Sequence, residues 1–184
     1  MNVYDFDKTI YNGDSTLDFF YFVLKRNNRL IKYLPIQILG LILYKFNIYS
    51  KEKFKSIFFI FIKDIDLKIE VDEFWKIYRT KIKKWYINKR KTTDVIISAS
   101  PDFLLEPFCN QINVNLICTK VDDATGKLVS KNCFGAEKVK RFKREFDSKI
   151  DEFYSDSKSD LPMANIALNA FLVKGEKVIE WSIN

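Results

Sequence analysis

The sequence predicts an α/β fold in which a parallel sheet carries an inserted all-helical cap. Two short apolar runs, residues 2–4 and 94–98, end in polar turns, as strands of a parallel sheet do where functional residues follow their carboxyl ends. The residues between these runs have helical periodicity and no β-turn signals. We therefore expect a core of residues 1–11 and 92–184 and a helical cap of residues 12–91.

Composition restricts the size of the fold and the kind of partner. The chain has 184 residues, of which 47% are apolar and 30% are charged, enough to bury one core that carries an inserted subdomain. Its net charge of +7 favours an anionic partner, such as a phosphorylated metabolite, an acidic lipid or a nucleic acid. The basic stretch at residues 81–91 is interrupted by aromatic and aliphatic residues, so no nucleic acid is expected.

The residue types that are missing restrict the chemistry. The sequence contains no histidine, which excludes His-based triads and HExxH metal sites. Its 3 cysteines have neither CxxC spacing nor an even count, so we expect reduced thiols without a disulfide framework or a zinc site. Catalysis must therefore use carboxylates, lysine or hydroxyl groups. The N-terminus reaches Asp5 with no room for a signal peptide, and we expect a cytoplasmic protein.

Three apolar stripes at helical spacing predict the helices of the cap. The stripe nearest the end of the cap predicts one continuous helix from residue 71 to residue 85. The stripes consist of Leu17, Phe20 and Leu24, of Phe54, Ile57, Phe58 and Phe61, and of Val71, Phe74, Trp75, Tyr78, Ile82 and Trp85.

In the core, the apolar run that ends at Ser98 is followed by a helix pattern from residue 103 to residue 112. We expect Ser100 as the N-cap of this helix and Pro101 as its first residue. Further strands are expected at residues 115–121, 127–130, 152–155, 170–173 and 177–181, with a Gly-containing turn between the first two. Helices are expected at residues 139–146 and after Pro162.

Four chemistry-bearing pieces of the chain lie at the ends of predicted elements. If the predicted strands are parallel neighbours, all four pieces reach one crevice at the carboxyl edge of the sheet. The pieces are Asp5-Phe6-Asp7-Lys8-Thr9, Ser98, Lys138 within Gly135-Ala136-Glu137-Lys138, and Asp156 with Asp160.

The carboxylates of this set suit the transfer of a phosphoryl group, whose loose transition state depends mainly on positioning and on cations. Asp5 can act as the nucleophile and form an aspartyl-phosphate. Asp7 can protonate the leaving oxygen and then activate water. Because Mg²⁺ prefers oxygen ligands, Asp5 and Asp156 together with the carbonyl of Asp7 form a candidate metal site.

The remaining polar groups suit a phosphate site. Ser98 and nearby backbone N–H groups, that of Ala99 included, are expected to bind phosphate oxygens, with Ser100 as the alternative contact. Lys138 is expected to neutralise phosphoryl charge. It lies among other basic residues, however, and its alternative interpretation is an ordinary solvated lysine of a helix.

The four motifs, in this order, resemble those of the haloacid dehalogenase (HAD) superfamily, and specifically its phosphoserine-phosphatase-like subfamily IB with a helical C1 cap. The resemblance runs from residue 5 to residue 162. It implies a Rossmann-like core, a HAD-type phosphatase activity and Mg²⁺ as the cofactor. By this resemblance, Asp5 is the nucleophile, Asp7 the acid and base, Thr9 and Ser98 phosphate-site residues, Lys138 the phosphate-binding lysine, Asp156 a metal ligand, and Asp160 its supporting carboxylate.

Several positions depart from the family pattern. Lys8 stands where the family commonly has Gly or Ser, and Ser155 stands where it commonly has Gly. Phosphoserine phosphatases usually follow the motif-two serine with two glycines, whereas Ala99 and Ser100 follow Ser98 here. This difference disfavours phosphoserine as the substrate. The apolar cap and the Tyr-Ser-Asp-Ser motif are similar to those of a membrane-associated phosphatidylglycerophosphate phosphatase of the same branch.

Individual site residues also have purely structural interpretations. Asp5 and Asp7 could be turn or helix-capping aspartates, and Asp160 could cap the helix that follows it. Asp14 could meet an amine on a substrate or cap the first helix of the cap.

Residues 30–48 form the most apolar segment of the chain. Its Lys and Gln residues make it a poor transmembrane helix, although it could rest in a membrane interface. Packing inside the cap is the alternative.

The leading hypothesis is a Mg²⁺-dependent phosphomonoester hydrolase that acts on a small phosphorylated metabolite or a lipid headgroup. A phosphotransferase with the same motifs and a lipid phosphatase at the membrane surface are alternatives. A non-catalytic protein that binds anions or membranes would not need Asp5, Asp7, Lys138 and Asp156 together.

Overall fold

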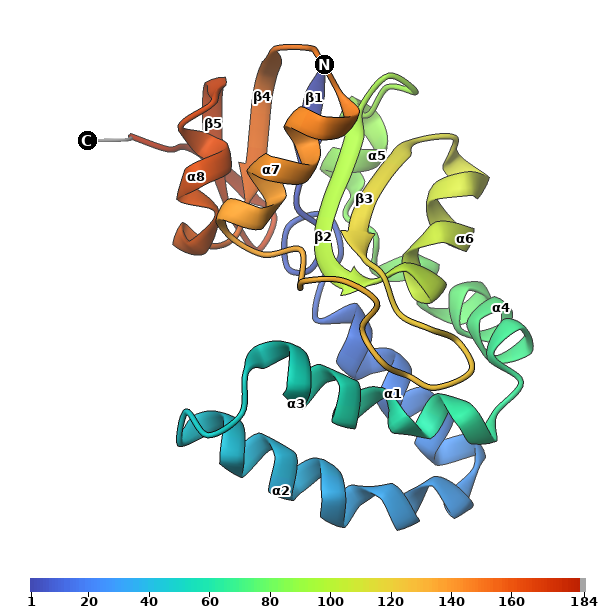
Figure 1. Cartoon of the computed structure of the whole chain (residues 1–184). Helices are drawn as coiled ribbons and strands as arrows, with labels where there is room; N and C mark the ends of the chain where they lie inside the picture. The colour runs from blue at the N-terminus through green and yellow to red at the C-terminus, as the bar shows by residue number, and fades with distance from the viewer. Residues whose placement is uncertain (183–184) are drawn as a thin grey trace.

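A six-stranded sheet forms the centre of the computed structural model, which describes residues 1–182 (Figure 1). The strand order is β3-β2-β1-β4-β5-β6, and all neighbours are parallel except β5 and β6. The predicted α/β fold with a parallel sheet is confirmed. The strands are β1 (Asn2–Tyr4), β2 (Val95–Pro101), β3 (Asn115–Thr119), β4 (Ile150–Ser155), β5 (Ala167–Lys174) and β6 (Lys177–Glu180).

Helices surround the sheet and form a separate layer at one end of it (Figure 1). The α-helices are α1 (Ser15–Arg26), α2 (Leu34–Lys45), α3 (Lys51–Phe58), α4 (Leu67–Tyr78), α5 (Lys84–Lys89), α6 (Asp102–Ile112), α7 (Ala136–Glu145) and α8 (Leu161–Ala164). The 3₁₀-helices are η1 (Asn28–Tyr33), η2 (Phe59–Asp64), η3 (Arg79–Lys81) and η4 (Lys158–Asp160).

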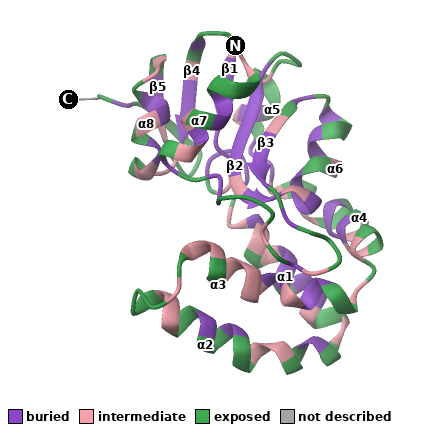
Figure 2. Cartoon of the chain, in the orientation of Figure 1, coloured by how far each residue is buried: buried purple, intermediate pink, exposed green. Residues whose placement is uncertain are grey.

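The alternation of side chains along each strand divides the core into two hydrophobic clusters, one on each face of the sheet. Val3 and Phe153 belong to the cluster that contains Met163 of α8. Their chain neighbours Tyr4 and Tyr154 belong to the other cluster, where their rings stack with centroids 4.9 Å apart. The central strands β1 and β2 are therefore buried on both faces and are purple in Figure 2, whereas β6 at the edge of the sheet is exposed.

The position of β1 determines where the polar motifs meet. Its neighbours are β2 on one side and β4 on the other, and the chain order runs outward from it in both directions. In open α/β sheets, ligands bind outside the carboxyl ends of the strands at such a switch point. The residues that follow β1 and β4 are therefore the first candidates for a site.

Helices α1, α2 and α3 form the layer below the sheet in Figure 1. Close packing joins two of them, since a Cβ on Gly40 of α2 would lie 3.1 Å from Cγ2 of Ile57 in α3. Helix α4 packs against α6, where Trp75 Nε1 donates to the carbonyl of Leu104 at 2.7 Å. The division of the chain into a core of residues 1–11 and 92–184 and a cap of residues 12–91 remains a prediction.

The two chain segments that join the sheet to the helical layer are bonded to each other. Asn12 N donates to the carbonyl of Lys81 at 2.8 Å, and Lys83 N donates to the carbonyl of Ile10 at 2.8 Å. The buried Lys83 ammonium also donates to the carbonyl of Lys8 at 2.5 Å. Both ends of the intervening helical segment are thus tied together beside β1.

Two predicted elements differ from the structure. The helix expected over residues 71–85 is wrong, because α4 ends at Tyr78 and Ile82 instead forms a β-bridge with Tyr11. The strand expected at residues 127–130 is also wrong. Within residues 1–182, Leu128 is the one residue of this stretch in a bridge, with Val121, and its N–H donates to Ser56 Oγ of α3 at 3.1 Å and not to a neighbouring strand.

The start of α6 differs as well. Ser100 is not its N-cap, because β2 continues through Pro101, which pairs with Thr119 of β3. Pro101 has extended angles and occupies the N-cap position itself. Ser100 is thereby free to place its hydroxyl at the end of β2. The N-cap role of Asp14 in α1 is confirmed, since its carboxylate accepts from Leu17 N.

The three cysteines, Cys109, Cys118 and Cys133, are buried free thiols. Burial raises the pKa of Cys109 to about 12 and that of Cys133 to about 11. Within residues 1–182, the helices are too short or too polar to cross a bilayer. The cytoplasmic location stays a prediction.

Candidate active site

The candidate site begins with Asp5, directly after β1. Its N–H donates to the carbonyl of Tyr154 at 2.8 Å, which extends the pairing of β1 with β4 by one step. The side chain is 12% exposed, and its Oδ1 accepts from Lys138 Nζ at 2.7 Å. The end of the strand therefore presents a nearly buried carboxylate with a cation on one oxygen.

Lys138 comes from the first turn of α7 and links two carboxylates. Its Nζ donates to Asp5 Oδ1 and to Asp160 Oδ2, both at 2.7 Å, and the lysine is 2% exposed. Burial alone would lower the pKa of Lys138, but the charges of Asp5 and Asp160 outweigh burial and raise that pKa. The lysine is therefore protonated and is not an ordinary solvated helix residue.

Thr9 connects Asp5 to Asp156. Its Oγ1 donates to Asp5 Oδ2 at 3.2 Å and accepts from the backbone N–H of Asp156 at 2.9 Å. The hydroxyl is completely buried. Two of the predicted metal ligands, which are about 150 residues apart in the chain, are thus joined through one side chain.

Asp7 faces the helical layer and is held by α1 and β2. Its Oδ1 accepts from Ser15 N, at the start of α1, at 2.6 Å. Its Oδ2 accepts from Ser100 Oγ at 2.5 Å. Burial, reinforced by the nearby charge of Asp14, raises the pKa of Asp7 to about 6 although both hydrogen bonds oppose the change.

Ser98 and Ala99 lie at the carboxyl end of β2. Ser98 Oγ accepts from Ser100 N at 3.0 Å, and the residue is 1% exposed. The carbonyl of Ala99 accepts from Lys55 Nζ of α3 at 2.6 Å. Among residues 1–182, neither Ser98 nor Ala99 is bonded to Asp5 or Asp7, so their contact with a phosphate stays a prediction.

Lys8 and Ser155, the two residues that differ from the common family pattern, each affect the structure of the site. Lys8 adopts a left-handed conformation with φ of 58°, which is uncommon for a residue with a Cβ. Its charge lowers the pKa of Asp156, although burial raises that pKa more strongly. Ser155 Oγ donates to Asp160 Oδ2 at 2.9 Å, so this hydroxyl supports the carboxylate that binds Lys138. Asp160 is thus bound from two sides and does not cap α8 through its side chain.

The surplus of carboxylates in the site fits a divalent cation. Burial raises the pKa of Asp5 although Lys138 opposes the change, and the charges of Asp160 and Asp7 raise it further. Residues 1–182 hold no group of three or more acidic or thiol side chains placed to share a metal. The predicted Mg²⁺ site needs only the carboxylates of Asp5 and Asp156, the carbonyl of Asp7 and several waters.

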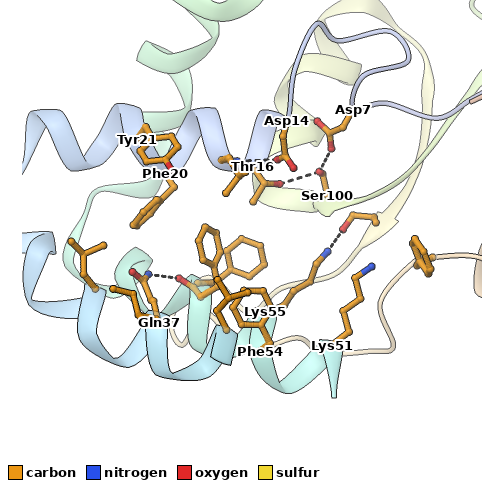
Figure 3. Close-up of a pocket in the computed structure, with 18 residues that line it drawn as sticks. Asp7, Asp14, Thr16, Phe20, Tyr21, Gln37, Lys51, Phe54, Lys55 and Ser100 are labelled. Atoms are coloured by element: carbon orange, nitrogen blue, oxygen red, sulfur yellow. Dashed lines mark hydrogen bonds between the residues drawn. The ribbon is translucent and has the colours of Figure 1, made fainter. Parts of the chain in front are cut away.

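A pocket of about 610 Å³ opens beside Asp7, between the sheet and the helical layer (Figure 3). Asp7, Asp14 and Ser100 lie at one end of it. Its walls are the facing surfaces of α1, α2 and α3, with Phe134 from the loop before α7. The volume is within the range of sites that bind small molecules.

Sequence reasoning missed the contribution of α3 to this pocket. Lys55 is half-buried and donates to Ala99 O and, at 2.7 Å, to Asn132 Oδ1. The signal was present, because Lys51, Phe54, Lys55 and Phe58 share one face of a helix. Lysines within an apolar stripe indicate a face that meets polar groups of the core.

Residues 3–165 match the haloacid dehalogenase-like hydrolase family, and the chain therefore belongs to that family. The resemblance of the motifs to this family is confirmed. Assignment to subfamily IB stays a prediction. No curated protein matches the sequence at a significant level.

Solved structures share the fold at low sequence identity. A protein of unknown function from Bordetella pertussis Tohama I has a TM-score of 0.67 and 18% identity, over 92% of this chain and 87% of that one. A probable phosphoserine phosphatase from Vibrio cholerae, in unliganded form, has a TM-score of 0.66 and 10% identity, over 92% of this chain and 55% of that one. A phosphoserine phosphatase with a phospho-aspartyl intermediate analogue has a TM-score of 0.53 and 15% identity, over 91% and 83%.

Proposed function

We propose that the chain is a Mg²⁺-dependent phosphomonoester hydrolase that forms an aspartyl-phosphate on Asp5. The observation that carries the proposal is the environment of the Asp5 carboxylate at the end of β1. One of its oxygens accepts from Lys138 Nζ and the other from Thr9 Oγ1. Such a carboxylate is oriented and is flanked by a cation that can neutralise phosphoryl charge. Membership in a family of hydrolases supports the same conclusion.

The reaction proceeds in two displacements. An oxygen of Asp5 attacks phosphorus, the bond from phosphorus to the substrate oxygen breaks, and Asp7 gives its proton to that oxygen. Water then attacks the phosphorus of the aspartyl-phosphate, Asp7 takes a proton from this water, and the bond to Asp5 breaks. Ser15 N and Ser100 Oγ fix the carboxylate of Asp7 throughout.

Asp5 and Asp156, with the carbonyl of Asp7, would hold the Mg²⁺ ion. When bound, the ion supplies positive charge to the equatorial oxygens of the phosphoryl group. Lys138 would supply a second positive charge through its bond to Asp5 Oδ1, and its bond to Asp160 holds it in position.

Removal of the metal tests this proposal. We expect EDTA to lower phosphate release from a panel of phosphomonoesters by at least about 100-fold and Mg²⁺ to restore it. Ca²⁺ should restore less than about a tenth of the rate, because its longer bonds and higher coordination number misplace Asp5. Phosphate release is measured by colorimetry on EDTA-treated protein with each ion added back. Equal rates with both ions would contradict the site.

The substrate class we propose is a phosphorylated small molecule or lipid headgroup. Two of the structures with the same fold are described as phosphoserine phosphatases, one of them only as probable. The pocket beside Asp7 has the size expected for a small-molecule ligand.

We also propose that α2 contacts a membrane surface, because its outer face is apolar and exposed. The exposed residues of this face and of the turn after it are Ile36, Leu39, Ile42, Phe46 and Ile48. Figure 2 shows that much of α2 is exposed. Packing inside the cap therefore explains only some of the apolar residues in the segment 30–48, such as the buried Leu30.

Basic residues in the segment just before α2 favour anionic lipid as the occupant of this face. Arg26 and Lys32 form ion pairs with Glu70 and Asp64. Lys25 and Arg29 form no ion pair within residues 1–182 and are exposed. Because each basic residue near such a surface contributes about 1 kcal/mol, the two unpaired residues contribute about 2 kcal/mol in addition to apolar insertion.

Co-sedimentation with liposomes tests this contact. We expect the bound fraction of the wild type to rise as the anionic lipid content rises. A Leu39→Asp/Ile42→Asp variant should lose most of this binding, because two carboxylates would enter the apolar interface. An Ile69→Asp/Ile77→Asp variant on the exposed face of α4 is the matched control and should bind as the wild type does. Wild type that stays in the supernatant at every composition would exclude the membrane contact.

A further inference from the structure

The pocket beside Asp7 has two chemically different ends. The polar residues Asp7, Asp14, Thr16 and Ser100 lie at the end next to the sheet, as Figure 3 shows. The wall away from the sheet is formed by side chains of α1, α2 and α3, which are almost all aliphatic or aromatic. They are Leu17, Phe20, Leu34, Ile38, Leu41, Phe54 and Phe58.

The apolar wall is preformed by contacts between its own aromatic rings. The ring of Phe20 lies 5.1 Å from that of Phe58, and Phe54 lies 6.2 Å from Phe58. Tyr44 stacks on Phe54 at 5.4 Å and supports it from outside the pocket. Rings packed in this way hold an apolar ligand without first having to reorganise.

We propose that the substrate is an amphiphilic phosphomonoester whose hydrocarbon chain lies in this pocket while its phosphate lies at Asp5 and Asp7. The inference rests on the proposed phosphatase function and specifies the substrate class of the same site. It follows from continuity, because one cavity of about 610 Å³ joins Asp7 to the apolar wall.

A compact polar substrate would leave this wall unused. Gln37 is the polar residue on the α2 side, and its Nε2 already donates to the carbonyl of Phe58 at 2.7 Å. Its Oε1 has no hydrogen-bond partner within residues 1–182 and can accept one bond, but the charged groups of an amino acid body would lose more hydration along this apolar wall than that bond returns. A hydrocarbon chain, in contrast, gains from leaving water.

The basic residues of the pocket stay near its polar end. Lys55 Nζ is held by Ala99 O and Asn132 Oδ1, and Lys51 Nζ lies 3.6 Å from the centroid of the Phe134 ring. Both lysines lie on the Asp7 side of Phe54 in Figure 3. Their charges suit a phosphorylated headgroup and leave the remainder of the pocket to the chain.

Two wall residues also reach the surface. Ile38 is 56% exposed and Leu41 is 38% exposed, so the apolar end of the pocket is open to the outside along α2. A chain could therefore come from a dissolved long-chain phosphate or from a lipid within a bilayer. The chemistry of the pocket is the same for both sources.

Binding of alkyl phosphates of increasing length tests the inference independently of turnover. The dissociation constants of ethyl, butyl and octyl phosphate are measured by titration calorimetry, below micellar concentration and without Mg²⁺. We expect octyl phosphate to bind at least about 30-fold more tightly than butyl phosphate, because each buried methylene contributes about three- to fourfold. Equal affinities for butyl and octyl phosphate would overturn the inference.

Variants of the wall residues test whether the hydrocarbon chain of the ligand lies against the apolar wall. Ile38→Asp and Leu41→Asp should each weaken octyl phosphate binding at least about tenfold and leave ethyl phosphate binding within about twofold. Both positions are partly exposed, so the fold should survive. Ile77→Asp, at 57% exposure on α4, is the matched control and should bind both ligands as the wild type does. A loss in the control as large as in the wall variants would overturn the assignment.

Phosphate release with Mg²⁺ separates this inference from the proposed function. Chain-dependent binding without release from any alkyl phosphate would support the pocket and refute the phosphatase. Release from small phosphomonoesters without any dependence on chain length would support the phosphatase and refute the pocket. A further comparison shows whether the substrate comes from solution or from a bilayer. Phosphate release is measured from dissolved octyl phosphate and from a long-chain phosphate embedded in neutral phosphatidylcholine vesicles. Faster release from one of them identifies the form in which the enzyme takes its substrate.

Discussion

Asp5→Asn is expected to abolish phosphate release, with a decrease of at least about 1,000-fold in kcat/KM. The amide is a poor nucleophile, and it cannot supply the carboxylate oxygen that attacks phosphorus. The fold should remain, because the Asn Oδ1 can still accept from Lys138 and because Lys138 keeps its bond to Asp160. Kinetics with a phosphomonoester and thermal unfolding of the same preparation check both halves of this expectation.

Asp66→Asn is the matched control for this substitution. Asp66 caps α4 through Ile69 N, it lies far from β1 in the chain, and Asn caps helices about as well as Asp does. The control should keep full activity. Activity of Asp5→Asn within tenfold of the wild type would remove Asp5 from its role. Mass spectrometry of the Asp7→Asn variant after brief incubation with substrate should place any trapped phosphate on Asp5 and on no other residue.

Lys138→Ala should cost both activity and stability. Its removal leaves the buried carboxylates of Asp5 and Asp160 without their common cation, a change that typically costs about 3–5 kcal/mol. For a chain of this size, such a loss lowers the midpoint of thermal unfolding by about 10 °C. We expect kcat/KM to fall at least about 100-fold, because phosphoryl charge and Asp5 both lose their partner. Differential scanning calorimetry and steady-state kinetics measure the two effects.

Lys140→Ala and Lys143→Ala provide the comparison within the same helix. Both lysines are exposed residues of α7, so each substitution should change stability by less than about 0.5 kcal/mol and leave kcat/KM unchanged. A similar response at all three positions would mean that Lys138 has no special role.

The sequence predicted the core better than the connections. Strand β1 and the residues after it could be predicted because buried parallel strands leave apolar runs that end in polar motifs. The break after Tyr78 could not be predicted, since the apolar spacing continues through Ile82. After α4 the chain instead forms the 3₁₀-helix η3 and then the bridge between Ile82 and Tyr11, a partner 71 residues earlier in the chain.

In the candidate site, too, some features could be predicted from the sequence and others could not. Asp5, Thr9, Lys138 and Asp160 were identified as a set from their motifs, and the structure brings their side chains together through hydrogen bonds. The bond from Ser100 to Asp7 was not predicted. Ser100 followed by proline is typical of a helix N-cap, and only the pairing of β2 with β3 shows that the strand continues past it.

The hydrogen bonds between the two ends of the helical segment have a consequence for how the length of this segment can change. The segment between Asn12 and Lys81 leaves the sheet and returns to it at the same point, where two backbone bonds of 2.8 Å hold its ends together. We expect such a segment to behave as an interchangeable module. Because the entropy of closing a loop grows only with the logarithm of its length, substituting a longer or shorter helical module at this junction would cost little stability. Asp5 would keep its place beside β4, while the helices that line the pocket could be exchanged.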